Sequence, residues 1–150
     1  MIPTNVLLDA IATRIASDAG TLAHATDGVL LHLAKAVFNP GPTLVVGDFT
    51  EADFDGYAAL EAGAGAQQFF VDPISTERTI QVLEPAGGWH FETTGVTNLP
   101  QTIRGAYLTN NAGTVLYGSV LFDDPVVLTA ANEAVDVSNV RFRLHNDLIR

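Results

Sequence analysis

The chain has 150 residues, of which 47% are hydrophobic and 16% are charged, and its net charge is −10. This length is typical of one domain with a sizeable core, and the composition is too apolar for a disordered chain. The few cations are spread along the sequence, which argues against nucleic acid or an anionic membrane as a partner. Because cysteine is absent, disulfides, thiolate metal sites and thiol nucleophiles are excluded.

The first twenty residues predict one amphipathic helix, residues 4–19. Thr4 or Asn5 can cap its N-terminus, and Gly20 follows its C-terminal end. Apolar residues recur within it at spacings of three and four: Leu7, Leu8, Ile11, Ala12 and Ile15. The segment has no basic leading region, and no apolar run reaches the roughly 20 residues of a membrane span. We therefore expect a soluble protein that is made in a cytoplasm.

The segment VLLHLAKAVF, from Val29 to Phe38, predicts a buried β-strand. Its branched apolar residues fall on both alternations, which is typical of a strand covered on both faces. Residues 39–42, with the sequence Asn-Pro-Gly-Pro, stop the strand because they are strong turn formers.

The rest of the sequence consists of short β-like runs separated by turn signals rich in Gly, Pro, Asn and Asp. These runs occupy residues 67–71, 79–84, 89–93, 102–109, 114–122, 125–129 and 134–144. They predict an antiparallel β-sandwich or barrel over residues 29–144, within a single domain of residues 1–150. The clearest hairpin is YLTNNAGTVLY, from Tyr107 to Tyr117, because its loop residues tolerate positive φ. In VRFRL, residues 140–144, alternation predicts one buried and one exposed face.

The stretch GDFTEADFDGYAAL, residues 47–60, raises the question of a calcium loop. With Gly56 as the glycine at position six of such a loop, oxygen ligands fall on positions one, three and five: Glu51, Asp53 and Asp55. The twelfth position, which should be a bidentate glutamate, is Ala62, and Gly and Pro residues replace the flanking helices. We therefore interpret the stretch as a solvated acidic turn without a metal, with its aromatic residues packed inward: Phe49, Phe54 and Tyr57.

Catalytic patterns are weak in this sequence. No serine lies in a G-x-S-x-G setting, and no H-E-x-x-H pair is present. His90 and Glu92 lie on the same side of a predicted strand and could form a metal or acid/base pair, but a surface contact is the simpler interpretation. His32, in a strongly apolar run, is interpreted as a hydrogen-bonded core or interface histidine.

Two further features have both a structural and a functional interpretation. Asp123 and Asp124 precede Pro125, and we expect them to start a turn between two strands, not to act as a glycosidase acid/base pair. Trp89 follows two glycines and could stack on a sugar, but it is more typical of a core or interface anchor.

Three motifs in the last two-thirds of the chain carry a resemblance to a protein family. They are the FDGY turn at residues 54–57, the GGW sequence at residues 87–89, and the hairpin sequence that begins at Gly105. A further pattern, PVVLTAANEAVDV, starts at Pro125. Over about 100 residues the chain resembles small virion structural proteins of tailed bacteriophages, from the head and tail gene region. The resemblance implies a particle component without enzyme activity and leaves open whether it lies on the head or the tail.

We therefore expect a non-enzymatic component of a bacteriophage virion, made in the host cytoplasm, without cofactors. Its expected partners are copies of itself and other capsid or tail proteins, with no nucleic acid and no membrane. The alternative is a recognition module for a glycan or host-surface receptor, suggested by Trp89, Tyr107 and Tyr117 near turns. A hydrolase using His90 with Glu92, or an acidic pair, is the weakest alternative. The candidate interface residues are Leu7, Ile11, Ile15, Leu31, Leu33, Phe38, Phe54, Tyr57 and Trp89.

Overall fold

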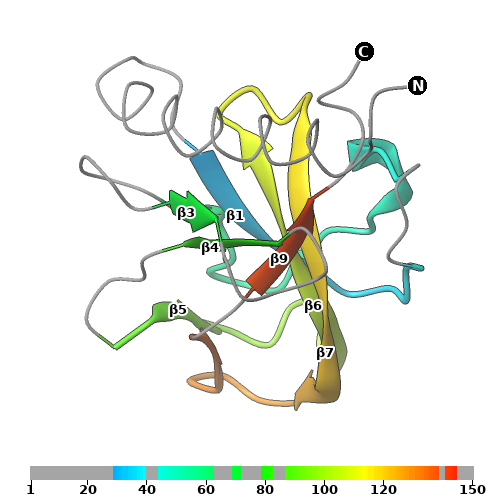
Figure 1. Ribbon diagram of the computed structural model, residues 1–150. Coiled ribbons are helices and arrows are strands. Elements are labelled where there is room, and N and C mark those ends of the chain that lie inside the picture. Colours follow the sequence, from blue (N-terminus) through cyan, green and yellow to red (C-terminus); the bar gives the residue numbers. More distant parts are fainter. Residues whose placement is uncertain are drawn as a thin grey trace, which may run out of the picture.

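The computed structural model describes residues 29–39, 44–62, 69–71, 79–82, 87–138 and 141–144 (Figure 1). The predicted N-terminal helix, residues 4–19, lies outside these ranges. The described part is mainly β, as predicted, and its only helix is the three-residue 3₁₀ turn η1 (Val46–Asp48). The strands are β1 (Val29–Ala34), β2 (Leu60–Glu61), β3 (Phe69–Val71), β4 (Thr79–Val82), β5 (Trp89–Glu92), β6 (Gln101–Asn110), β7 (Leu116–Leu128), β8 (Ala134–Val137) and β9 (Arg141–Leu144).

The strands form two antiparallel sheets. The larger sheet has seven strands in the order β2-β1-β6-β7-β9-β4-β3, and the smaller pairs β5 with β8. Every pair of neighbouring strands is antiparallel, which confirms the predicted strand direction. Among the described strands, β2 and β3 are the two ends of the large sheet and do not pair with each other. The predicted alternative of a closed barrel is therefore not formed by this part of the chain.

The two sheets contribute to the same hydrophobic core. Trp89 and Phe91 of β5 alternate with exposed residues and point into this core, as do Val135 and Val137 of β8. From the large sheet, buried core residues include Leu31, Leu33, Ile103, Leu108 and Phe142. Burial of each large apolar side chain contributes about 1.5–3 kcal/mol, so this shared core holds the small sheet to the large one.

Strand β1 is buried on both faces, as its apolar sequence predicts. Leu31 and Leu33 lie in the core shared by the sheets, whereas Ala34 belongs to a second buried cluster with Phe38 and Tyr107. The strand ends at Ala34, four residues before the predicted end, although Phe38 remains buried. Burial of β1 on both faces explains why polar residues are scarce in it.

The outer edge of β1 is covered by the segment from Thr50 to Ala62. Ala52 N–H donates to the Leu33 carbonyl at 2.9 Å, and Ala62 N–H donates to the Val29 carbonyl at 2.7 Å. Between these points the Leu33 N–H donates to the Tyr57 hydroxyl at 3.0 Å, where a neighbouring strand would offer a carbonyl. An uncovered edge is a template for pairing with other chains, so this segment closes it.

The predicted hairpin is confirmed as the turn between β6 and β7. The Asn110 Oδ1 atom accepts the backbone N–H groups of Thr114 at 2.8 Å and Val115 at 2.9 Å. Gly113 has a φ of 66° and donates its N–H to the Asn110 carbonyl at 2.9 Å. The side chain of Asn110 and the left-handed glycine together explain why the sequence signal is strong here.

The predicted turn at Asp123–Pro125 is wrong, because β7 runs without interruption from Leu116 to Leu128. The register pairs Ile103 with Val126 but Gly105 with Leu121, so four residues of β7, 122–125, lie opposite Arg104 alone. The turn-forming sequence thus makes a large bulge within a strand. Proline fits such a position because a bulge does not need its missing N–H.

The predicted single strand at residues 134–144 is also wrong in its extent. It is divided into β8, which pairs with β5, and β9, which pairs with β4 and β7. Each half continues its own alternation, with Val135 and Val137 buried in β8 and Phe142 buried in β9. Both halves have a period of two, but the buried positions change from odd numbers in β8 to an even number in β9, which marks the break between them.

Candidate functional site

The acidic stretch that resembles a calcium loop directs its carboxylates to four different partners. Asp48 Oδ2 accepts the Val45 N–H at 2.9 Å, and Asp55 Oδ2 accepts the Thr97 N–H at 3.1 Å. Glu51 and Asp53 contact side chains of other segments, described below. Within the part of the chain that the structure describes, no group of three or more His, Asp or Glu side chains could hold a metal ion. Phe54 is buried, and Phe49 and Tyr57 are partly buried, so the aromatic residues pack inward as predicted.

The first polar cluster surrounds His32, which is buried as predicted. Its Nδ1 lies 2.6 Å from Glu51 Oε1, and its Nε2 lies 2.8 Å from Thr109 Oγ1. The Thr109 hydroxyl donates its hydrogen to the Asn110 carbonyl at 2.8 Å. Each ring nitrogen of His32 therefore has a polar partner, and which of the two donates depends on the tautomer.

Two tyrosines complete the His32 cluster. The Tyr57 hydroxyl donates to Glu51 Oε1 at 2.8 Å, and the Tyr107 ring stacks on the His32 ring at 4.7 Å between centroids. Burial raises the pKa of both phenols, so they stay protonated and can donate hydrogen bonds. The hydrogen bond from His32 lowers the pKa of the Glu51 carboxyl, although burial opposes this.

The hydrogen-bonded chain from Thr109 through His32 to Glu51 resembles a catalytic triad of nucleophile, base and acid. Thr109, however, has no exposed surface, and its hydroxyl hydrogen is engaged by a backbone carbonyl. A nucleophile must reach the substrate and pass its proton to the base, and neither condition is met here. The cluster therefore joins β1, β6 and the segment that covers the β1 edge.

The second polar cluster lies on the exposed face of the small sheet. His90 Nδ1 is 2.6 Å from Asp136 Oδ1, and Nε2 is 3.9 Å from Glu92 Oε2. The hydrogen bond that His90 makes to the Asp136 carboxylate raises the pKa of His90, because it favours the protonated imidazole. The predicted surface contact is confirmed, but its closer partner, Asp136, is missed by the sequence because pairing of β5 with β8 brings residues 46 positions apart together.

Several of the candidate contact residues are buried inside the protein. Trp89 and Tyr107 are 3% and 2% exposed, so neither ring is available to stack on a sugar. Tyr57 is partly buried, and the apolar candidates of the described part lie in its own core: Leu31, Leu33, Phe38 and Phe54. Leu7, Ile11 and Ile15 lie outside the described residues. Among the residues that the structure describes, the exposed large apolar side chains are instead Val37, Val45, Val96, Leu121 and Val127.

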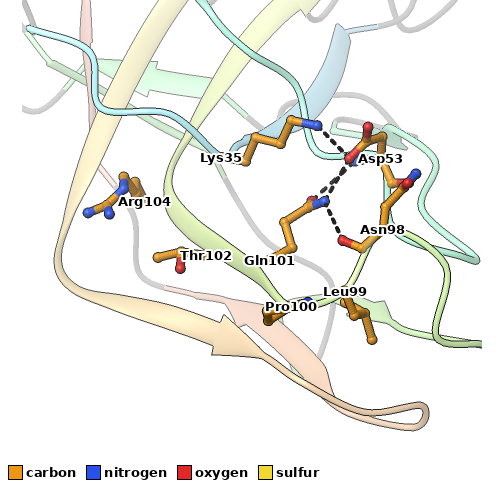
Figure 2. A pocket seen from close by; sticks show the side chains of 8 residues that line it. All are labelled: Lys35, Asp53, Asn98, Leu99, Pro100, Gln101, Thr102 and Arg104. Carbon is orange, nitrogen blue, oxygen red and sulfur yellow. Dashed lines mark hydrogen bonds and ion pairs between the residues drawn. The ribbon is translucent and has the colours of Figure 1, made fainter.

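An open pocket of about 580 Å³ lies where three segments meet. Lys35 follows β1, Asp53 belongs to the acidic stretch, and the third segment runs from Asn98 into the start of β6. Figure 2 shows Arg104 and Thr102 on one side of this pocket and a hydrogen-bonded group on the other. The sequence offered no signal for this pocket, because its residues are 69 positions apart at the extremes, from Lys35 to Arg104, and follow no motif.

The hydrogen-bonded group has Asp53 at its centre. Asp53 Oδ1 lies 2.5 Å from Lys35 Nζ and accepts Gln101 Nε2 at 2.6 Å. The Asp53 N–H donates to Gln101 Oε1 at 3.2 Å, and Asn98 Nδ2 donates to the Asp53 carbonyl at 2.8 Å. Lys35 holds the pKa of Asp53 below its ordinary value. These contacts fix the pocket wall and neutralise the Lys35 charge.

The Arg104 guanidinium differs from Lys35 because it forms no ion pair or hydrogen bond with any described residue. Its strand position, opposite the bulge at residues 122–125, leaves it partly exposed at the pocket. Lys35 and Asp53 cancel, so the charged side chains that line the pocket leave a net charge of one positive unit.

Comparison with known proteins does not add a family. No family model matches the chain, and no curated protein or solved structure matches it. A search of the described residues for a membrane-crossing helix finds none of sufficient length and apolarity. The geometry of the described residues, together with the motifs of the sequence, is therefore the basis for the function proposed below.

Proposed function

We propose that the chain is a non-enzymatic structural component of a bacteriophage virion, made in the host cytoplasm. It assembles with copies of itself or with other capsid or tail proteins and needs no cofactor. The proposal rests on the resemblance to small phage virion proteins, and one structural observation supports it most directly. In two of the motifs that carry the resemblance, glycine is required where a turn approaches the small sheet.

Two of these motifs show the structural role at the level of single atoms. In the FDGY turn, Gly56 has a φ of 86°, and a Cβ there would lie 2.7 Å from the Thr94 side chain. In the GGW sequence, Gly88 has a φ of 82°, and a Cβ would lie 2.8 Å from the Val137 carbonyl oxygen. Only glycine satisfies both requirements, so these motifs fasten the turns to the small sheet.

The proposal also includes the arrangement of the two sheets. We infer a β-sandwich in which the small sheet covers one face of the large sheet, because residues of both share one core. A sandwich with one covered edge at β1 is a rigid unit that would keep its own fold inside an assembly.

Most of the interface residues predicted from the apolar pattern are buried within the protein, so the assembly contacts in this proposal are other residues. Leu7, Ile11 and Ile15 remain candidates, as one face of a predicted helix. Two exposed valines join them, Val37 at 69% and Val96 at 68% exposed. Scattered single apolar residues are normal on protein surfaces, so the helix face is the stronger candidate.

The experiment is size-exclusion chromatography with light scattering over a concentration series. We expect a defined oligomer or a growing assembly, and the Ile11→Asp variant should lower its mass. The Ala58→Asp variant is the matched control, because it adds the same charge at an exposed position of the acidic stretch. A monomer at every concentration would contradict self-assembly and favour docking on another virion protein.

Recognition of a glycan or host-surface receptor is the second candidate function. Burial of Trp89 and Tyr107 removes two of the three aromatic contacts that first suggested it, and the third, Tyr117, is partly buried. The pocket beside Arg104 gives it a different basis, because an unpaired guanidinium on a protein surface can bind an anionic group.

A further inference from the structure

The pocket beside Arg104 is a local exception to the charge of the chain. The whole sequence carries a net charge of −10, yet the charged side chains of this pocket sum to one positive unit. Asp53 does not oppose an anion strongly, because Lys35 Nζ lies 2.5 Å from its Oδ1. Any anion that enters therefore meets one uncompensated cation, Arg104.

The chemistry of that cation favours a carboxylate. A guanidinium presents parallel N–H groups that match the two oxygens of a carboxylate. A phosphate monoester carries close to two negative charges and is bound by clusters of cations, whereas here the second cation, Lys35, is already paired. A single free guanidinium therefore suits a monoanionic carboxylate better than a phosphate.

The other groups in the pocket are suited to hydroxyls. The Thr102 hydroxyl forms no hydrogen bond with a described residue, and Asn98 uses its Nδ2 but not its Oδ1. Figure 2 shows Thr102 near Arg104 and Asn98 across the pocket, with Gln101 between them and Pro100 and Leu99 on the lower side. The volume of about 580 Å³ lies within the usual range for small-molecule sites, roughly 300–1,000 Å³.

We propose that this pocket binds a carboxylated sugar unit, such as a uronic acid. Arg104 holds the carboxylate, Thr102 and Asn98 contact the hydroxyls, and Leu99 and Pro100 support the ring. This role goes beyond the structural function proposed above and does not depend on it. A uronic acid has about a dozen non-hydrogen atoms and would bind here without aromatic stacking. Its dissociation constant should therefore be on the order of 1 mM.

The test is an NMR titration of the ¹⁵N-labelled chain with sodium glucuronate. We expect saturable shifts of the backbone amides of Asn98, Gln101, Thr102 and Arg104. Glucose and acetate, which lack the carboxylate and the hydroxyls respectively, should each bind at least several-fold more weakly. Equal binding of glucose would overturn the role of the carboxylate, and equal binding of acetate would overturn the choice of a sugar.

Two variants at Arg104 test the guanidinium itself. Arg104→Gln should weaken glucuronate binding about tenfold or more, since a hydrogen bond to a charged group is lost. Arg104→Lys keeps the charge but loses the paired N–H groups. Its affinity for glucuronate should therefore lie between that of the unmodified chain and that of Arg104→Gln. Unchanged affinity in Arg104→Gln would overturn the proposal.

Two further outcomes are also informative. If neither variant folds, the comparison of glucuronate with glucose on the unmodified chain still decides the matter. Absence of any saturable shift, combined with a smaller assembly mass for Arg104→Gln, would overturn sugar binding and assign Arg104 to contact an acidic side chain of a neighbouring copy. Glucuronate binding by a chain that stays monomeric would support this inference while contradicting self-assembly.

Discussion

Glu51 occupies the position at which the acidic stretch meets the interior of the chain. Its carboxylate accepts hydrogen bonds from His32 and Tyr57, although its side chain is 42% exposed. The energetic contribution of a half-exposed pair is reduced by solvent, so its direction with pH is more informative than its size.

Glu51→Gln should therefore destabilise the chain in a pH-dependent way. The pKa of Glu51 is lowered from its ordinary value of 4.5, so the folded chain binds this proton less tightly than the unfolded chain. The resulting stability is present above pH 4.5 and is lost as the pH falls through the lower folded value. Urea unfolding at several pH values should show that Glu51→Gln has a lower free energy of unfolding than the unmodified chain at neutral pH. This difference should shrink in acid.

The matched control for this prediction is Glu61→Gln. Glu61 is exposed and lies in the same covering segment, and its replacement removes the same charge. A deficit of equal size in both variants would mean that net charge, and not the contact with His32, is responsible.

Gly105 gives a second prediction at the scale of one residue. A Cβ at this position would lie 2.3 Å from the Val120 carbonyl oxygen and 2.9 Å from the Phe38 ring. Gly105→Ala should therefore cost about 1–3 kcal/mol of unfolding free energy, as overpacked cores do. Gly47→Ala is the control, because a Cβ there meets nothing within 4 Å. Denaturant unfolding of both variants measures the difference, and equal stability would contradict the close approach.

At the scale of elements, the edge of β1 is covered partly by backbone and partly by one side chain. The Tyr57 hydroxyl takes the hydrogen bond of Leu33 N–H at a point where the covering segment turns away from the strand. At this point the edge of β1 is protected by a side-chain hydroxyl, whereas at Ala52 and Ala62 it is protected by backbone hydrogen bonds.

Tyr57→Phe should leave the ring packed but remove the acceptor of the Leu33 N–H. An unsatisfied buried donor costs about 1–3 kcal/mol, and the Leu33 amide should exchange with solvent faster. Hydrogen exchange monitored by NMR measures this directly. The Asn110 amide, which donates to the Val115 carbonyl in the hairpin, is the internal reference and should change only with global stability. Equal acceleration of both amides would show that the hydroxyl has no local role.

The elements also show which parts of the structure are predictable from the sequence. The hairpin at Asn110 and Gly113 is local, because the residues that set its turn lie within five positions of one another. The bulge at residues 122–125 is not, since the same Asp-Asp-Pro sequence can turn a chain or protrude from a long strand. What decides between them is pairing with β6, a tertiary contact that overrides the local signal.

The same distinction between local and tertiary contacts applies to the candidate sites. His90 and Glu92 are two positions apart in one strand, so their common face follows from strand alternation alone. Asp136, the closer partner of His90, depends on the register between β5 and β8. The pocket depends on three segments, so neither Lys35 nor Arg104 could be assigned to it before the fold was known.

At the scale of the whole molecule, the net charge of −10 acts on every contact between copies. Like charges repel over a distance set by the Debye length, about 10 Å at 0.1 M salt and about 3 Å at 1 M. The repulsion opposes association, whereas apolar contacts such as the predicted helix face favour it.

Self-association should therefore grow as the salt concentration rises, if copies of the chain meet through apolar surfaces. Light scattering between 0.05 and 1 M NaCl, values chosen to span the range of screening, should show an increasing mass. Calcium chloride at matched ionic strength should act no differently from sodium chloride, because the carboxylates of residues 48–55 bind four separate partners. A specific gain with calcium would mean that these carboxylates leave their partners to bind the ion, and a mass that falls with salt would place ion pairs, not apolar contacts, between the copies.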